Sequence, residues 1–378
     1  MNNKNFNVCF DLGSSKIRAA AFNISDIKNS FYLESFCNSN FNTKNSDYLN
    51  LESEIEKITL NLEKKTNEYL DSINLMIDTP EMFSVSLSLS KNFDNVKLKK
   101  EDVQFLIQDA KQQISKNYPD YNIMHIIIKN YKINNENFDF LSTEIDCNIL
   151  SIDIIFICIP KKIIGDLKKI FSKFDVSIHQ IFCSSYAKSL SYRENFKLNE
   201  NVAFIDMGYN KTSINYYDKN NFIFFHTLPI GGNHITKDLS KILNIDLVIA
   251  EQIKLHFDTD KKILIEHNIS LDLIRKIIFA RIEEILELSI KSIGLNEDLV
   301  AINEFRLIVM GEGSKILDNK FKDKISFSKK IDLLEETNLG ICESALRISE
   351  GTNKKEVVII PKKQTNVGFF EKLFHFFN

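Results

Sequence analysis

The chain repeats one pattern in its two halves, and this repeat limits the folds that it can adopt. Residues 7–21 are expected to form a strand, a tight turn containing Asp-Leu-Gly, and a second strand. Residues 202–217 repeat this arrangement with Asp-Met-Gly at the turn. A third glycine turn, at 310–314, follows an expected strand over 305–309. Because helices alternate with the strands, the sequence predicts an α/β protein in two similar halves.

Hydrophobic spacing between these turns predicts further helices and strands. Apolar residues recur at helical spacing in three segments, 51–69, 99–115 and 161–174. Apolar or strictly alternating segments predict strands over 73–77, 83–89, 124–128 and 152–159.

Length and composition exclude several classes of protein. The 378 residues suffice for two domains, and 48 Lys and Arg against 51 Asp and Glu leave no chain-wide basic surface for nucleic acid. The longest apolar run, 154–159, is too short to span a membrane, and the polar residues 1–7 lack a signal-peptide core. Six cysteines without a C-x-x-C pair indicate reduced thiols. The sequence therefore argues against secretion, a zinc ribbon and a membrane-spanning helix.

The three turns carry the groups that a nucleotide requires. Gly13 allows close approach of the backbone, the two serines after it offer donors, and Lys16 offers a cation. Asp11 and Asp206, each at a strand end, are placed to hold Mg²⁺ through water. A single turn of this kind is more often an ordinary hairpin than a phosphate loop. Three turns in this order indicate two hairpins that clamp phosphates, with an adenosine against the third turn.

With these turns, the chain resembles the actin/Hsp70/sugar-kinase superfamily and, within it, the FtsA family of bacterial division proteins. The segments that carry the resemblance are DLGSSKI, ICIPKKIIGDLKKIF, VSIHQIFCSSYAKSLSY, LPIGGNHITKDLSKIL, AEQIK and ARIEEILEL. The resemblance implies an actin-like ATPase fold, with two RNase H-like domains flanking a nucleotide cleft and an FtsA-type 1C insertion subdomain. It also implies ATP and Mg²⁺ as cofactors.

The resemblance carries over to individual nucleotide-binding residues. They are Asp11, Gly13, Ser14, Ser15 and Lys16 in the first loop; Asp206, Gly208 and Thr212 in the second; Gly231 and Gly232; Glu251 and Lys254; Arg281 and Glu284; and Gly311, Gly313 and Ser314. These residues could also have purely structural roles. Glu251–Lys254 and Arg281–Glu284 could be solvated ion pairs on helices, and the glycine pair could be a simple turn.

Two departures from the family pattern bear on catalysis. The second loop, usually glycine-rich, contains Tyr209, Asn210 and Lys211, whose side chains crowd a phosphate, although Lys211 could itself contact an anion. In the third turn Glu312 adds negative charge. We therefore expect ATP binding with slow hydrolysis at most, and no residue is named as the general base. The histidines lack metal-ligand spacing, so none is assigned to a metal.

The resemblance also divides the chain into subdomains. The expected division is 1A at 1–78 and 151–198, 1C at 79–150, 2A at 199–228 and 304–348, 2B at 229–303, and a linker at 349–366. An insertion of this length with another role would look similar to 1C. The family places contacts to a neighbouring subunit of a filament in 1C and the contact to the FtsZ tail in 2B.

Residues 367–378 form the last expected element, an amphipathic membrane-targeting helix. At 100° per residue its apolar face consists of Phe369, Phe370, Leu373, Phe374, Phe376 and Phe377. The alternative is a helix that docks on its own domain. One Lys and one Glu give a weak electrostatic attraction to lipid, so stable attachment is expected to require many copies in a filament.

The expected function is that of an ATP-binding division protein that polymerises on the cytoplasmic face of the cell membrane. It would tether FtsZ filaments, the Z-ring, through the FtsZ C-terminal tail and help recruit other divisome proteins at the division site. Its partners would be FtsZ, further copies of itself and lipid, but no nucleic acid. Two alternatives stay open, a PilM-like interaction protein of a pilus or secretion platform and a small-molecule kinase of the same superfold.

Overall fold

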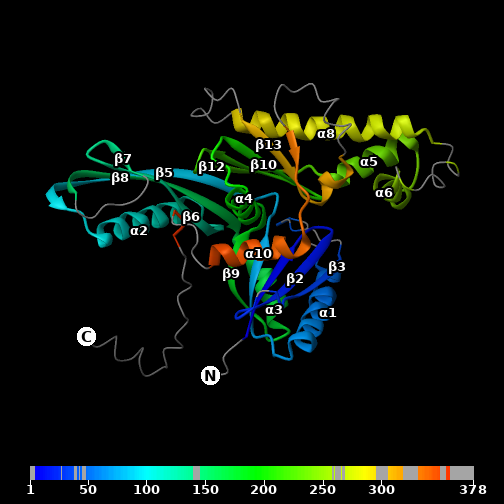
Figure 1. Cartoon of the computed structure of the whole chain (residues 1–378), viewed down its shortest axis with the longest axis horizontal. Helices are drawn as coiled ribbons and strands as arrows, with labels where there is room; N and C mark the ends of the chain where they lie inside the picture. The colour runs from blue at the N-terminus through cyan, green and yellow to red at the C-terminus, as the bar shows by residue number, and fades with distance from the viewer. Residues whose placement is uncertain are drawn as a thin grey trace.

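The computed structural model describes residues 5–26, 28–37, 41, 43–44, 48–138, 145–257, 259, 265, 269–294, 305–317, 331–349 and 355–357. The described residues form two five-stranded sheets and one four-stranded sheet, with helices packed against them (Figure 1). The α/β prediction is therefore confirmed.

The first sheet has the strand order β3-β2-β1-β4-β9. Its strands are β1 (Phe6–Leu12), β2 (Lys16–Asn23), β3 (Phe31–Phe36), β4 (Ser72–Ile77) and β9 (Ser177–Cys183). The helices α1 (Leu49–Thr66) and α3 (Lys161–Ser172) pack against it. Strands β1 and β4 are buried over most of their length, and most of their residues are apolar.

The second sheet, β12-β11-β10-β13-β14, repeats the strand order and directions of the first. Its strands are β10 (Val202–Met207), β11 (Thr212–Asp218), β12 (Asn221–Leu228), β13 (Arg306–Met310) and β14 (Ile331–Leu333). The helices α5 (Gly232–Leu243), α6 (Leu247–His256) and α8 (Leu271–Gly294) belong to this half, as does the short 3₁₀ helix η2 (Glu312–Ile316). In α8, Ile274, Ile278, Ile282 and Ile285 are buried at helical spacing, which fixes the helix on its sheet.

Two helices connect the halves. The helix α4 (Ser184–Asn195) follows β9 of the first sheet and packs against β11 of the second. The helix α10 (Asn338–Ser349) follows β14 of the second sheet and packs against β1 and β2 of the first, where Figure 1 shows it in orange. Each half thus supplies one helix to the interface between the halves.

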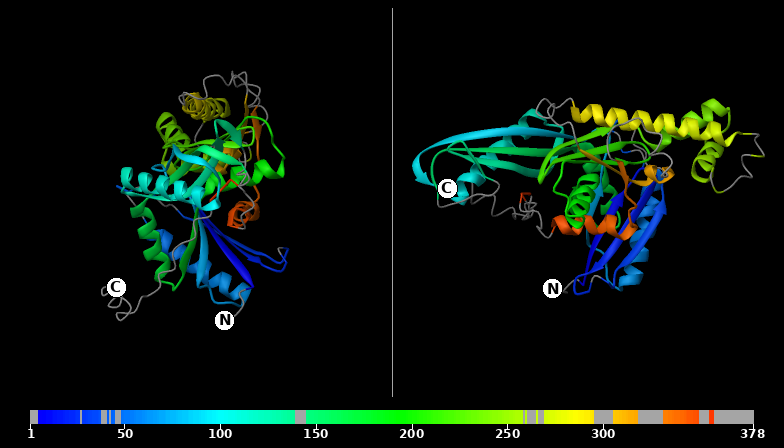
Figure 2. Two further views of the ribbon diagram at one scale, coloured as in Figure 1. Left: turned by 90° about the vertical axis from the view of Figure 1, so that its left-hand side faces the viewer. Right: turned by 45° about the horizontal axis from the view of Figure 1, so that its top comes forward.

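The third sheet, β5-β8-β6-β7, extends to one side of the two larger sheets, opposite α5 and α6 (Figures 1 and 2). It consists of β5 (Phe83–Lys97), β6 (Tyr121–Ile133), β7 (Glu136–Phe138) and β8 (Asp146–Pro160), with α2 (Lys100–Asn117) on one face. Strand β8 continues through the expected 1C boundary at 150, so this sheet contains residues on both sides of that boundary. The division into subdomains remains a proposal.

Residues 355–357, inside the expected linker, lie along β6. Glu356 forms a bridge with Ile127, and the Val357 N–H donates to the Ile126 carbonyl at 2.9 Å. The Glu356 carboxylate accepts a hydrogen bond from Nδ1 of the buried His125 at 2.5 Å. The expected helix at 367–378 lies outside the described residues.

Candidate nucleotide-binding site

The first and second hairpin turns have the same backbone geometry. In the first, the Gly13 N–H donates to the Lys16 carbonyl at 3.0 Å; in the second, the Gly208 N–H donates to the Lys211 carbonyl at 2.9 Å. The flanking strands pair in equivalent register, so Lys16 and Lys211 occupy the same position in four-residue turns. Both turns line one cleft, where the two halves meet.

Lys16 projects into this cleft. Its ammonium lies 3.4 Å from Glu34 and 3.9 Å from Glu312, and both of these carboxylates are partly exposed. Such loose pairing leaves the ammonium able to bind a phosphate.

Lys211 is instead held by its own protein. Its Nζ lies 3.0 Å from Asp78 Oδ2 and donates to the Ser213 hydroxyl at 2.8 Å. Burial alone would raise the pKa of Asp78, but Lys211 and the donors Ser185 and Cys183 outweigh it and hold the pKa well below its usual range. The anion that Lys211 contacts in this structure is Asp78.

Asp11 is paired with a cation on the neighbouring strand. Arg18 lies directly opposite it in the register, and Nη1 is 3.1 Å from Asp11 Oδ2. The Ser184 hydroxyl, at the start of α4, donates to Asp11 Oδ1 at 2.8 Å. Arg18 also contacts Glu312 at 2.5 Å, and although burial opposes its charge, the two acids raise the Arg18 pKa.

Asp206 receives its cation from the other half of the molecule. The residue opposite it in the register is Ser213, and the cation comes instead from Lys188 on α4, whose Nζ is 2.6 Å from Asp206 Oδ2. Lys188 also lies 3.3 Å from Glu336, which precedes α10. Burial is the largest effect on Glu336 and raises its pKa, with Asp206 adding to this and Lys188 opposing it.

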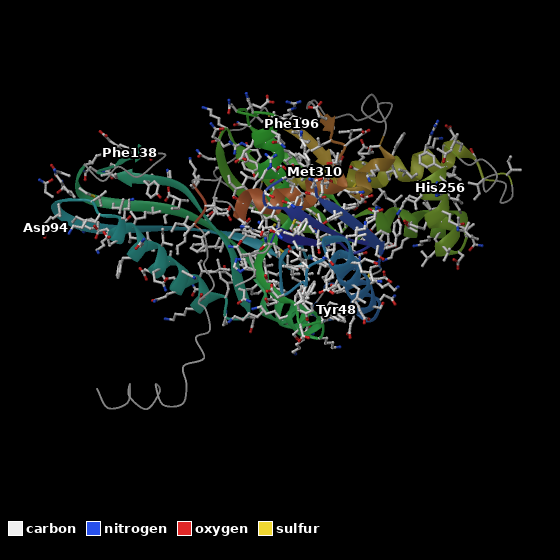
Figure 3. All side chains as sticks on the ribbon, turned by 60° about the horizontal axis from the view of Figure 1, so that its bottom comes forward. Tyr48, Asp94, Phe138, Phe196, His256 and Met310 are labelled. Carbon is white, nitrogen blue, oxygen red and sulfur yellow. The ribbon has the colours of Figure 1, made fainter. Side chains whose placement is uncertain are left out.

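The third turn closes the cleft from the second half. Gly311 has φ +95°, and a Cβ there would lie 2.3 Å from Asp206 Oδ1, so only glycine fits. Its N–H donates to Glu336 at 2.8 Å. Figure 3 labels the preceding residue, Met310, near the middle of the molecule, between Asp94 at the end of the third sheet and His256 on α6.

A cavity of about 500 Å³ adjoins the cleft, and Ser15, Lys16, Tyr209 and Glu312 line both. Gly232 and Gly313 line it with bare backbone, and Glu251 and Lys254 of α6 line it with charge. Lys254 is buried, donates to Glu251 at 2.7 Å and to Thr236 at 2.9 Å, and lies 5.3 Å from the Tyr209 ring. Burial lowers the Lys254 pKa, and Glu251 opposes this. The size and lining suit a nucleoside.

The structure brings most of the expected nucleotide-binding residues together. The cleft or the adjoining cavity is lined by Asp11, Gly13, Ser14, Ser15, Lys16, Asp206, Gly208, Gly232, Glu251, Lys254, Gly311 and Gly313. Gly231, Thr212 and Ser314 support the turns from behind. A Cβ on Gly231 would lie 2.5 Å from the Gly208 carbonyl, and the Thr212 and Ser314 hydroxyls donate to the carbonyls of Ile230 and Gly311.

Arg281 and Glu284 lie apart from this group. Arg281 pairs with Asp238 of α5 at 2.6 Å and with Glu284 at 2.5 Å, so it ties α8 to α5. Neither residue lines the cleft or the cavity.

Five polar residues of the cleft were missed by the sequence reasoning: Arg18, Asp78, Ser184, Lys188 and Glu336. Asp78 had a signal, because it directly follows the buried strand β4, which lies beside β1 and ends at the same edge. Arg18 had one too, since a hairpin places it opposite Asp11. Lys188 and Glu336 come from distant segments, and nothing local in the sequence marks them.

A second cavity, of about 480 Å³, lies among the described residues between β6, α3 and β9, away from the three turns. Within the described ranges, no three His, Cys, Asp or Glu side chains are grouped for a metal ion, and no helix is long and apolar enough to cross a bilayer. All six cysteines are free and buried.

Comparisons with known proteins relate the chain to one family. A family model described as "Cell division protein FtsA" matches residues 203–277. The FtsA of Helicobacter pylori (strain ATCC 700392 / 26695) is 34% identical over 97 residues, which are 26% of this chain and 20% of the relative. The FtsA of Buchnera aphidicola is 22% identical over 348 residues, covering 81% of this chain and 82% of the relative. The matched segment thus spans a fifth of the Helicobacter protein and most of the Buchnera protein.

Two solved structures show the likeness of the fold. A PilM-PilN type IV pilus biogenesis complex is similar with a TM-score of 0.59 at 10% identity, over 90% of this chain and 98% of that one. MreB 5 of Spiroplasma citri bound to AMPPNP is similar with a TM-score of 0.50 at 12% identity, over 93% and 98%.

Proposed function

Because this chain is a relative of the FtsA cell division proteins with an actin-like ATPase fold, we propose that it is an ATP-binding membrane adaptor of cell division. It polymerises on the cytoplasmic face of the cell membrane and holds FtsZ filaments there. The observation that carries the nucleotide part is the meeting of two equivalent hairpin turns at one cleft, beside a cavity of nucleoside size.

The residues of the cleft fit a nucleotide. Lys16 and the backbone of the first turn face the phosphates, Gly232 and Gly313 allow the nucleoside to lie against the backbone, and Glu251 is placed for polar contacts from α6. Gly311 and Gly231 keep the turns close together, since a side chain at either position would collide with them.

The donors of the cleft do not fit the expected magnesium ion. Mg²⁺ needs carboxylate oxygens free to bind it or its water shell. Asp11 already binds Arg18 and Ser184, and Asp206 binds Lys188. A magnesium ion held by Asp11 and Asp206 would have to displace these cations, so our account includes no step through the metal.

The same pairing argues for slow hydrolysis. A general base needs a carboxylate or imidazole free to accept a proton. In the described part of the cleft, Asp11, Asp78, Asp206, Glu312 and Glu336 each contact a lysine or an arginine. We therefore assign no catalytic residue.

The remaining parts of the proposal rest on the family relationship and the sequence. Residues 367–378 bind the membrane with the six-residue apolar face, region 229–303 binds the FtsZ tail, and the third sheet contacts the next subunit of a filament. Avidity along the filament then makes attachment stable.

Co-sedimentation with anionic liposomes tests this function. The full chain and a variant ending at Asn366 are compared with and without ATP. We expect pelleting that requires residues 367–378 and increases with ATP, while the shorter variant stays folded and soluble. A shorter variant that aggregates would instead indicate a helix docked on its own domain. A full chain that remains soluble in every sample would contradict membrane attachment.

A PilM-like interaction protein is the alternative that the fold favours, because the PilM-PilN structure matches most of the chain. Binding to the FtsZ tail separates the two functions, since a PilM-like protein has no use for it. A kinase of the same superfold would instead turn over a small hydroxylated substrate.

A further inference from the structure

Lys188 lies between two acidic groups of the cleft. Its Nζ is 2.6 Å from Asp206 Oδ2 and 3.3 Å from Glu336 Oε1. The three side chains are almost entirely buried, with exposed fractions of 7%, 9% and 5% for Lys188, Asp206 and Glu336. With two carboxylates at ion-pair distance, the side chain is held as an ammonium.

This ammonium has the position and the charge to act on a bound phosphate. Lys188 lines the cleft together with both hairpin turns and Lys16. An ammonium group has three N–H donors. Two of them serve Asp206 and Glu336, which leaves one for a further acceptor. A buried lysine held in this way acts as a point charge toward phosphate, as lysine does in other phosphate sites.

The second cation of the cleft is equally fixed. Arg18 binds Asp11 at 3.1 Å, and its side chain is only 6% exposed. Asp11 and Asp206, one residue before the ends of the equivalent strands β1 and β10, thus each pair with a cation of the protein. A divalent ion in this superfamily is expected at these aspartates, and here it would have to compete with Arg18 and Ser184 for the Asp11 oxygens and with Lys188 for Asp206 Oδ2.

From this arrangement we infer that Lys188 supplies the positive charge that a divalent cation would bring to the phosphates, so that the chain binds ATP without a metal. This inference rests on the proposed nucleotide binding and specifies how that site balances the charge of the phosphates. It also predicts which residue confers independence from the metal.

The test is a calorimetric titration of the full chain with ATP, once with Mg²⁺ and once with EDTA. We expect the two dissociation constants to agree within about threefold, a free-energy difference of less than about 1 kcal/mol. In Lys188→Gln, which keeps a donor but loses the charge, we expect affinity in EDTA to fall about 10- to 100-fold, the loss of a charged hydrogen bond. Mg²⁺ should restore part of it. Lys188→Arg should remain independent of Mg²⁺.

Two further variants keep the test decisive. Lys169→Gln removes an exposed lysine of α3, 81% exposed, and should leave both dissociation constants unchanged. If Lys188→Gln fails to fold because Glu336 and Asp206 lose their partner, the double variant Lys188→Gln/Glu336→Gln removes one acid with the cation. It should bind ATP only with Mg²⁺.

The outcomes distinguish this inference from the function on which it rests. Wild-type binding that requires Mg²⁺ would overturn the inference and leave ATP binding intact. Metal-independent binding by the foldable glutamine variant would give Lys188 a structural role only. Absence of ATP binding in both buffers would overturn the proposed nucleotide site itself, and the inference with it.

Discussion

The two hairpin turns have one backbone geometry and two different roles. Gly13-Ser14-Ser15-Lys16 and Gly208-Tyr209-Asn210-Lys211 close with the same hydrogen bond between equivalent strands. In the first turn, the lysine lies near two partly exposed acids. In the second turn, the lysine forms an ion pair with the buried Asp78. Equivalent positions in a repeated fold can therefore differ in environment, because the acids beside Lys16 are partly exposed and the acid beside Lys211 is buried.

The acids follow the same rule. Two residues after the strand positions that pair with Asp11 and Asp206 come Asp78 and Glu312. Each turn lysine contacts the acid of the opposite half, Lys211 with Asp78 and Lys16 with Glu312. Asp78 is 2% exposed at its side chain and Glu312 is 29% exposed, so the crossed pairs differ mainly in their access to water.

Replacing the two lysines separates these roles most strongly. Lys211→Met leaves the Asp78 charge buried without its partner and should lower the free energy of unfolding by about 3–5 kcal/mol. Lys16→Met should change stability by about 1 kcal/mol or less, since its partners are solvated. It should weaken ATP binding about 10- to 100-fold instead. Denaturant unfolding and ATP titration measure both. Equal losses of stability in Lys211→Met and Lys16→Met would contradict the difference between the two turns.

The two acids should differ in their pH dependence. Asp78→Asn should destabilise the protein at neutral pH by about 3–5 kcal/mol, because Lys211 is left buried and unpaired. The folded-state pKa of Asp78 is lowered, so its contribution is present above the usual value of 3.8 and is lost as the pH falls toward the folded-state pKa. The difference from wild type should therefore shrink below about pH 4.

Controls for this pH effect come from the same site. Glu312→Gln should lower the free energy of unfolding by about 1 kcal/mol, since the Glu312 carboxylate is partly exposed. The double variant Asp78→Asn/Lys211→Met should regain part of the loss, because both charges are gone. A stability difference for Asp78→Asn that stayed constant down to pH 3 would contradict the assigned pair.

Local sequence predicted the turns, but it could have indicated only some of the residues that pair with them. The pattern of apolar strands and glycines places the three turns, and the structure confirms the strands around them. Arg18 and Asp78 could have been found from hairpin register and from the end of β4 beside β1. Lys188 reaches Asp206 only because α4 crosses to the second sheet. That crossing depends on how the halves pack, which no short segment encodes.

Substitutions of two glycines, one in each half, are expected to change stability in opposite directions. Gly311→Ala places a Cβ 2.3 Å from Asp206 Oδ1 at positive φ and should cost about 2 kcal/mol or more. Gly165→Ala, inside α3 with nothing within 4 Å of the new Cβ, should stabilise the chain by about 0.5–1 kcal/mol. Thermal or denaturant unfolding should show opposite signs. A gain at position 311 would mean that the third turn does not press against Asp206.

The central claim is that both hairpin turns face one bound nucleotide, and amide hydrogen exchange with and without ATP tests it most directly. We predict that ATP slows amide exchange in residues 13–16, 208–211 and 311–314 together. Exchange of the residues that line the cavity between β6 and β9 should stay unchanged. Protection of the first turn alone, or protection confined to the β6–β9 cavity, would contradict a shared cleft.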